Sequence, residues 1–190
     1  SATPALDHLV VIAPTLAVGR AWVEARLGVA LQDGGHHERM GTHNALLRLG
    51  SATYLEATAI EPAAAAPDRP RWFELDGLAP GDAPRLATWV ARVPDLPAAV
   101  AACPVPLGEI LPMRRGSLSW RIAVPPDGRF VGGGLVPAVI AWDDPAAHPA
   151  ARGQDALAGA RVADADAAPL GERGEGLRDG MHATVDRPHA

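Results

Sequence analysis

The segment LDHLVVIAPTLAVGRAWVEARLG, residues 6–28, joins a short apolar strand to a helix. The strand is rich in β-branched residues and ends at Pro14. Thr15 is a favourable N-cap residue for the helix, and Gly28 stands where a C-cap glycine belongs. We therefore predict a strand from Leu6 to Pro14, followed by a helix that ends at Leu27 and Gly28.

The same landmarks return 80 residues later, in LATWVARVPDLPAAVAACPVPLG, residues 86–108. A proline again ends the strand, an N-cap residue follows it, and Leu107–Gly108 stands where Leu27–Gly28 stands in the first copy. Agreement on a single spacing indicates a duplicated unit. We expect both helices to end at these Leu-Gly pairs.

Three more strands follow each helix in the sequence pattern. They cover residues 29–35, 42–50 and 52–62 in the first copy, and 109–113, 117–125 and 135–145 in the second. The prediction is an α+β fold in which two βαβββ modules form a curved mixed-sheet cleft. Its parts are a first module over residues 5–62, a linker over 63–72, a second module over 73–149 and a small C-terminal appendage over 150–190. Within the appendage we predict only two weak strands, near residues 157–162 and 181–185.

The composition limits the partners. The chain has 190 residues, a formal net charge of −5 and 48% hydrophobic residues, and all 17 of its basic residues are arginine. It lacks the basic surface that nucleic acid requires, an apolar run that could span a bilayer, and a lysine for Schiff-base chemistry. Cys103 is the only cysteine, so neither an intrachain disulfide nor a multi-cysteine metal site can form. We expect a cytoplasmic protein, and we leave a homodimer open.

Polar residues gather on one face of the predicted first module. In a βαβββ unit the last strand can return beside the first, and side chains alternate between the faces. This alternation places His8, Asn44 and Glu56 on the concave face, with His8 and Glu56 on neighbouring strands. A carboxylate in an apolar strand must be paired, bound to a metal or shifted in pKa.

Other polar residues receive a structural interpretation. Gly34, Gly35 and Gly41 are most simply turn residues that need a positive φ. His36 and His37 fit a solvated turn near the rim, and His148 fits a surface loop. One guanidinium of the Arg114–Arg115 pair could hold a substrate carboxylate at the mouth of the cleft. Trp120 and Trp142 fit the core or the wall of a cleft.

The combination of LDHLVV, GGHHERMGTHNALLRLG and YLE resembles the first module of glyoxalase-like proteins in the vicinal oxygen chelate superfamily. RRGSLSWRI and GGGLVPAVIAW resemble the second module, so the resemblance covers about residues 6–149. It implies paired βαβββ modules around a cleft, and an enzyme of the lyase, isomerase or dioxygenase type. The alternative is a protein of the same fold that binds or sequesters a small molecule without catalysis.

The resemblance also suggests roles for individual residues. Many members of the superfamily hold a divalent metal, and His8 and Glu56 match positions that often supply its ligands. The second module offers Thr88 at the repeat position of His8, and VPAVIAW contains no carboxylate. His37 or His43 would have to be the third ligand, so we expect any metal to be held loosely. The predicted catalytic residues are Glu56 and His8, and the predicted substrate-binding residues are Asn44, His37, Arg115 and Trp120.

Overall fold

The computed structural model describes residues 3–152. The first module contains β1 (Ala5–Ile12), α1 (Leu16–Leu27), β2 (Gln32–His37), η1 (Glu38–Met40), β3 (Thr42–Arg48) and β4 (Tyr54–Ile60). A connecting 3₁₀ segment, η2 (Trp72–Gly77), leads to β5 (Arg85–Arg92), α2 (Leu96–Ala102), β6 (Glu109–Arg115), β7 (Leu118–Val124), η3 (Val131–Gly134) and β8 (Ala138–Trp142). The chain then forms η4 (Pro145–Ala147) and α3 (Pro149–Arg152). The two weak strands predicted beyond residue 152 lie outside the described residues.

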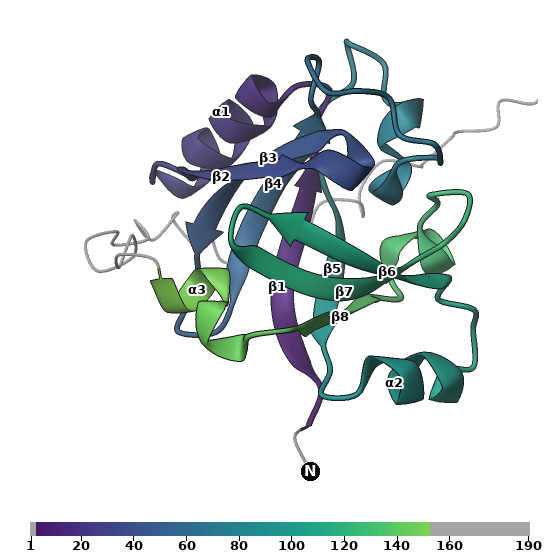
Figure 1. Ribbon diagram of the computed structural model, residues 1–190. Coiled ribbons are helices and arrows are strands. Elements are labelled where there is room, and N and C mark those ends of the chain that lie inside the picture. The colour runs from purple at the N-terminus through teal and green to yellow at the C-terminus, as the bar shows by residue number, and fades with distance from the viewer. Residues whose placement is uncertain (1–2, 153–190) are drawn as a thin grey trace, which may run out of the picture.

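The eight strands form one mixed sheet in the order β2-β3-β4-β1-β5-β8-β7-β6. In each module the first and last strands pair in parallel, β1 with β4 and β5 with β8, and β1 pairs with β5 in antiparallel fashion at the centre. The strands at the two ends of this order, β2 and β6, come close to each other, so the sheet is strongly curved (Figure 1). The predicted α+β fold of two βαβββ modules is confirmed.

The pairing of β1 with β5 shows which residues are equivalent in the two modules. Leu9 lies opposite Trp89, His8 opposite Val90 and Val10 opposite Thr88. A two-fold rotation that places β1 on β5 therefore superposes His8 on Thr88. These residues are 80 positions apart, which is the offset that the sequence repeat predicts. Glu56 pairs with Val10, and Ala138 pairs with Val90. The same rotation therefore superposes Glu56 on Ala138.

Each of the two central strands carries a bulge at the equivalent position. The register shifts between Leu6 and His8 on β1, and between Thr88 and Leu86 on β5. The unpaired residues are thus Asp7 and Ala87, which are again 80 positions apart. A bulge interrupts the alternation of side chains between the two faces of a strand. In the first module it allows Asp7 and His8 to contact the same group of residues.

The helices start as predicted, but only α1 ends as predicted. The side chains of Thr15 and Asp95 accept hydrogen bonds from Val18 N and Ala98 N, as N-caps do. Gly28 caps α1 in the left-handed conformation. The prediction that the second helix runs to Leu107–Gly108 was wrong, since α2 ends at Ala102. The prolines that follow Cys103 lack the N–H groups that a continuing helix needs.

The hydrophobic core has three parts. Each helix packs on the outer face of its own half of the sheet: α1 covers a cluster that includes Val23, Leu47 and Leu55, and α2 covers one that includes Leu96. The third and largest cluster fills the concave side, where both modules meet. It includes three buried indoles, from Trp72, Trp120 and Trp142. The candidate site lies within this aromatic interior.

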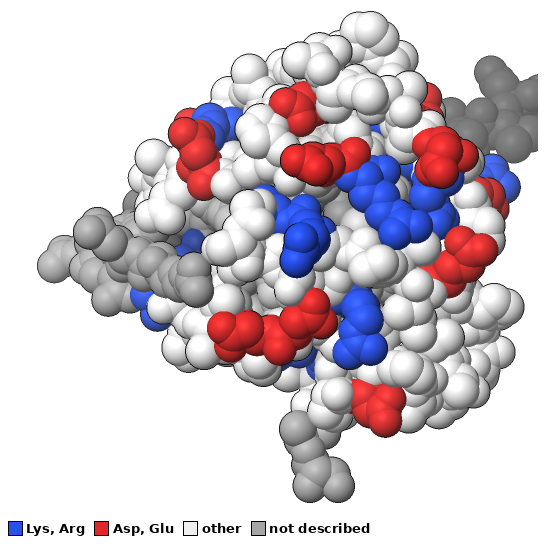
Figure 2. Space-filling model, in the orientation of Figure 1, with Lys and Arg blue, Asp and Glu red and all other residues white. Residues whose placement is uncertain are grey.

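The outer surface is mixed in charge. In Figure 2 acidic and arginine side chains lie side by side on the visible face, with wide uncharged areas between them. No helix within residues 3–152 combines the length and the hydrophobicity that crossing a bilayer requires.

Candidate functional site

A small cavity opens on the concave side of the first module. Both modules and η2 contribute to its wall, which consists of His8, His37, Tyr54, Glu56, Trp72, Phe73, Arg115, Trp120, Ile122, Ile140 and Trp142. We call it the polar cavity. A wider cleft, of about 630 Å³, between β2 and the β6–β7 hairpin also reaches Arg115, so this arginine lies between the polar cavity and solvent.

His8 and Glu56 face each other inside the polar cavity. They lie on the paired strands β1 and β4, and His8 Nε2 is 3.5 Å from Glu56 Oε2. Both residues are about 95% buried. Tyr54 stacks on the His8 ring at 4.5 Å between centroids. Burial, together with the nearby charges of Asp7 and Glu56, raises the pKa of Tyr54, so its phenol stays neutral.

Asp7 supports His8 from the side opposite Glu56. Its Oδ1 lies 2.7 Å from His8 Nδ1. Its Oδ2 accepts hydrogen bonds from Trp142 Nε1 at 3.0 Å and Arg92 Nη1 at 3.0 Å, and lies 3.1 Å from His148 Nε2. Burial alone would raise the pKa of the Asp7 carboxyl, but the hydrogen bonds and charges of His148 and His8 hold it well below its ordinary value. Asp7 is therefore an ionised, fully buried carboxylate.

The ionised Asp7 determines the protonation pattern of its neighbours. A carboxylate can only accept, so His8 Nδ1 must carry the hydrogen of this short contact. Nε2 of a neutral His8 would then present a lone pair to Glu56, and two acceptors would face each other. His8 therefore turns its Nε2, and not its Nδ1, towards Glu56.

His37 is a buried neutral histidine on the same cavity wall. Its Nδ1 lies 3.1 Å from Thr42 Oγ1 and its Nε2 lies 3.4 Å from Asn44 Nδ2. Its ring meets Trp72 and Trp120 edge-on. Burial, helped by the positive charge of Arg115, lowers the pKa of His37 to about 3.

Arg115 reaches the polar cavity across the gap between β6 and β2. Its Nη1 donates to Asn44 Oδ1 at 3.2 Å, and the same oxygen accepts from Gly35 N at 2.9 Å. Asn44 is thus placed behind Arg115 and is not one of the residues that line the cavity. The arginine turns a fixed positive charge towards the cavity mouth.

The structure gathers most of the predicted site residues. His8, Glu56, His37, Arg115 and Trp120 all line the polar cavity, and Asn44 contacts two of them. Asp7, Tyr54, Trp72 and His148 join them although sequence reasoning gave them no catalytic or binding role. Sequence reasoning missed Asp7 because strict alternation assigned it to the helix side.

Three structural interpretations from the sequence were wrong. His37 is not solvated but 97% buried, because β2 continues through it. His148 is also buried, against Asp7. Gly41 has a positive φ, as predicted, whereas Gly34 and Gly35 do not. Both are glycines because a Cβ there would collide with the Asn44 side chain or the Arg115 side chain.

Comparisons with known proteins agree with this fold. The profile of the glyoxalase-like domain family matches residues 6–177. The chain belongs to the glyoxalase-like domain family. The resemblance predicted from LDHLVV, GTHN and YLE is therefore confirmed.

Solved structures similar to this glyoxalase-like chain are distant in sequence. A hypothetical protein from Staphylococcus aureus is 16% identical with a TM-score of 0.51, and the match covers 75% of this chain but only 59% of that one. A hypothetical protein from Bacillus halodurans is 10% identical with a TM-score of 0.51, covering 75% and 97% of the two chains. Methylmalonyl-CoA epimerase from Mycobacterium tuberculosis is 22% identical with a TM-score of 0.44, covering 72% and 86%. Such identities show the fold alone. A comparison with curated protein sequences gave no match.

The donor set of this glyoxalase-like domain does not fit the usual three-ligand metal site. Residues 3–152 contain no group of three histidine, cysteine or carboxylate side chains placed to hold one ion. His37 turns inward, but its ring nitrogens face Thr42 and Asn44. The equivalents of His8 and Glu56 in the second module are Thr88 and Ala138, which supply neither an imidazole nor a carboxylate.

Proposed function

We propose that the polar cavity is the active site of a small-molecule enzyme that transfers a proton to and from carbon. The observation that carries this proposal is the buried pair of His8 and Glu56, 3.5 Å apart, with ionised Asp7 against the far nitrogen of the imidazole. A buried imidazole beside a carboxylate suits general acid–base catalysis. The reaction class is that of an isomerase or a lyase.

In this mechanism the ionised Glu56 is the base. The Glu56 carboxylate removes a proton from a carbon next to a carbonyl group, and the electron pair of the C–H bond moves to the carbonyl oxygen to give an enolate. Return of the proton to the enolate gives an isomer, whereas loss of a leaving group from the neighbouring carbon gives a lyase product. His8 donates a hydrogen bond to the developing charge, and Asp7 keeps its ring oriented.

Arg115 suggests which substrates fit. It is the positively charged side chain on the wall of the polar cavity, and it lies at the mouth. A guanidinium matches a carboxylate in geometry and charge. The aromatic walls from Trp72, Trp120 and Trp142 suit an apolar body. We infer a small carbonyl compound that carries an anionic group.

The proposal can be tested by hydrogen exchange. We would incubate the protein in D₂O with a panel of branched thioesters, 2-oxo acids and 2-hydroxy ketones, each with a carboxylate, and follow the loss of the proton next to the carbonyl by ¹H NMR. Glu56→Gln should slow exchange by about 100-fold or more. Asp68→Asn removes an exposed carboxylate elsewhere and should exchange at the parent rate. Exchange that survives Glu56→Gln would rule out this base.

The second candidate is a protein that binds a small molecule without changing it. The three indoles around the polar cavity favour this alternative, since aromatic walls of this kind also occur in binding sites. The same panel separates the two functions. A compound that binds in the cavity, and keeps its carbon-bound proton in D₂O for as long as it does without protein, would support binding alone.

A further inference from the structure

His148 follows the last strand of the second module, but its side chain is buried against the first module. It lies between η4 and α3 and is 5% exposed. Its Nε2 is 3.1 Å from Asp7 Oδ2, and its ring meets the ring of Tyr54 at 5.5 Å between centroids. Asp7 lies at the edge of the His8 ring, and Tyr54 stacks on its face. His148 therefore contacts two side chains that support the imidazole of the polar cavity.

A backbone contact fixes the tautomer of His148. Its Nδ1 accepts a hydrogen bond from Ala150 N at 3.2 Å, so this nitrogen carries no hydrogen. The hydrogen of the ring then resides on Nε2, which faces the Asp7 carboxylate. His148 is thus a hydrogen-bond donor to Asp7. Because its other nitrogen is bound to a backbone group of α3, the ring cannot turn over without losing a bond.

Three donors converge on the same oxygen of Asp7. Trp142 Nε1 and Arg92 Nη1 donate to Oδ2, each at 3.0 Å, beside the hydrogen bond from His148. Arg92 Nη1 is 3.2 Å from His148 Nε2, as expected of two donors that share one acceptor. With Oδ2 occupied in this way, Oδ1 is left for His8 Nδ1 at 2.7 Å. The carboxylate cannot rotate away from His8 without breaking these bonds.

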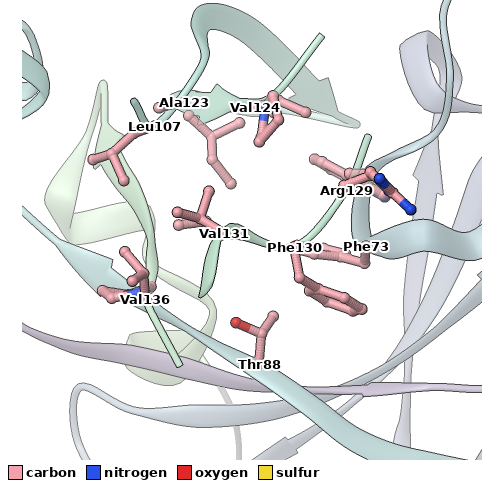
Figure 3. Close-up of a pocket in the computed structure, with 14 residues that line it drawn as sticks. Phe73, Thr88, Leu107, Ala123, Val124, Arg129, Phe130, Val131 and Val136 are labelled. Atoms are coloured by element: carbon pink, nitrogen blue, oxygen red, sulfur yellow. The ribbon is translucent and has the colours of Figure 1, made fainter. Parts of the chain in front are cut away.

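The second module builds the same backbone without this cluster. Ala87 stands at the bulge that Asp7 occupies in the first module. In Figure 3 Thr88, the counterpart of His8, lies at a small and mostly apolar cavity, which Ala138 also lines. The bulge and the paired strands therefore do not require a buried carboxylate. Because burying a charged cluster costs desolvation and the fold does not depend on it, the cluster points to a role in the chemistry of His8.

We propose that His148 is a positioning residue for His8. By donating a hydrogen bond to Asp7, it keeps the carboxylate directed at His8 Nδ1, and its ring fills the space beside Tyr54. The catalytic part of this inference rests on the proposed function, in which His8 donates a hydrogen bond to the developing charge. The orientation of the His8 ring can be measured without any substrate.

Two substitutions separate the donor of His148 from its ring. His148→Phe keeps a ring beside Tyr54 and Trp142 but has no donor for Asp7. His148→Gln restores a side-chain N–H group at a similar distance from the backbone. In both variants Asp7 keeps its two other donors, so its charge is not left unpaired. Leu55→Ala, in the cluster between α1 and the sheet, is the control for a loss of stability alone.

The first measurement is the exchange of the His8 Nδ1 hydrogen with water. It is followed in ¹H–¹⁵N NMR spectra of the full chain at pH 7, where the His8 signal is assigned by its absence in His8→Gln. His148→Phe should accelerate this exchange about fivefold or more, as the loss of one hydrogen bond allows. His148→Gln and Leu55→Ala should stay within about twofold of the parent.

Three results would overturn the proposal. The first is a parent protein with no detectable His8 Nδ1 hydrogen, since Asp7 would then not hold it. The second is an unchanged exchange rate in His148→Phe. The third is an equal acceleration in His148→Phe and either His148→Gln or Leu55→Ala, because the donor would then have no effect of its own.

Deuterium exchange into the carbonyl compounds described above measures the catalytic consequence. For each compound that the parent deuterates, His148→Phe should lower kcat about tenfold with KM within about twofold, and His148→Gln should recover most of the rate. An unchanged kcat, or a rise in KM alone, would overturn the catalytic part. If the parent deuterates none of the compounds, the proposed proton transfer fails, whereas the ring measurement still decides whether His148 holds His8.

Discussion

His37 is held neutral by its surroundings, and this has a direct effect on stability. The unfolded chain has a histidine with an ordinary pKa of 6.5, whereas in the folded protein burial and Arg115 lower the pKa of His37 to about 3. Between pH 6.5 and about pH 3 this histidine is protonated in the unfolded chain but neutral in the folded protein. Acid therefore favours unfolding, and the stability that is fully present above pH 6.5 is lost as the pH falls towards 3.

We predict that His37→Gln flattens this acid dependence. In the parent, His37 alone contributes up to about 1.4 kcal/mol per pH unit to the free energy of unfolding across this window. Denaturant unfolding at pH 7, 6, 5 and 4 measures the slope. Parallel curves for His37→Gln and the parent would contradict the buried neutral histidine.

The positions of single residues were predicted well where side chains alternate regularly between the two faces of a strand, and poorly where this alternation is interrupted. His8 and Glu56 were placed correctly because β1 and β4 are regular from His8 onward. Asp7 was missed because a bulge precedes His8, and the residues 6–9 contain no glycine or proline to signal it. His148 was missed because the contact that buries it, with Asp7, joins residues 141 positions apart. Sequence spacing cannot reveal such a contact.

At the scale of elements, α1 and the sheet beneath it were predicted from periodicity. Leu55 is 92% buried in the cluster between α1 and the sheet, as its register on β4 predicts. Trp22 packs against the same cluster but stays partly exposed, with the Arg26 guanidinium 3.9 Å above its ring. Its truncation should therefore cost less than that of a fully buried tryptophan.

We predict that Leu55→Ala lowers the free energy of unfolding by about 2–5 kcal/mol, since it removes buried methyl groups and leaves a cavity. Leu86→Ala is the control, because Leu86 is 56% exposed, and its change should stay within about 0.5 kcal/mol. The measurement is the denaturant midpoint at constant slope. Equal effects of the two substitutions would show that Leu55 does not carry the helix–sheet contact.

The connection between the modules could not be interpreted from its composition. Residues 62–70 contain many prolines and alanines, which is typical of a linker. The residues that follow place Trp72 and Phe73 in the wall of the polar cavity. Phe73 and Glu74 have a left-handed backbone there, which sequence patterns do not predict for phenylalanine or glutamate. Only the packing of η2 against the loop around Gly128 explains this conformation.

At the scale of the whole molecule, the two modules share a backbone plan and differ in chemistry. The repeat in the sequence predicted the shared plan, since Thr15 and Asp95 cap equivalent helices. It also showed that Thr88 replaces His8. The cavity that Thr88 and Ala138 line was not predicted, because its walls come from six separate stretches of the chain. A cavity formed by distant stretches has no local pattern.

The second module has no counterpart of the His8 imidazole or the Glu56 carboxylate, and this difference leads to a prediction about metals. His8 and Glu56 would leave most of a coordination sphere to water, so any divalent ion should bind weakly. Calorimetric titration of Zn²⁺, Mn²⁺ and Ni²⁺ into chelator-stripped protein measures this, with Glu56→Gln and His37→Ala alongside. Submicromolar binding that disappears in Glu56→Gln but survives His37→Ala would show that a ligand outside the predicted set completes the site.

The paired bulges at Asp7 and Ala87 also bear on how the gene can change in length. Loss of one codon in a strand normally turns every side chain beyond it to the opposite face. Loss of codon 7 or codon 87 would instead convert a bulge into regular pairing, because the residues on both sides already match their partners. At codon 87 an alanine would be lost, whereas at codon 7 the deletion would remove the carboxylate that orients His8. One-codon deletions in β1 and β5 should therefore be tolerated by the sheet at these two points, and only the one in β1 should abolish the proposed chemistry.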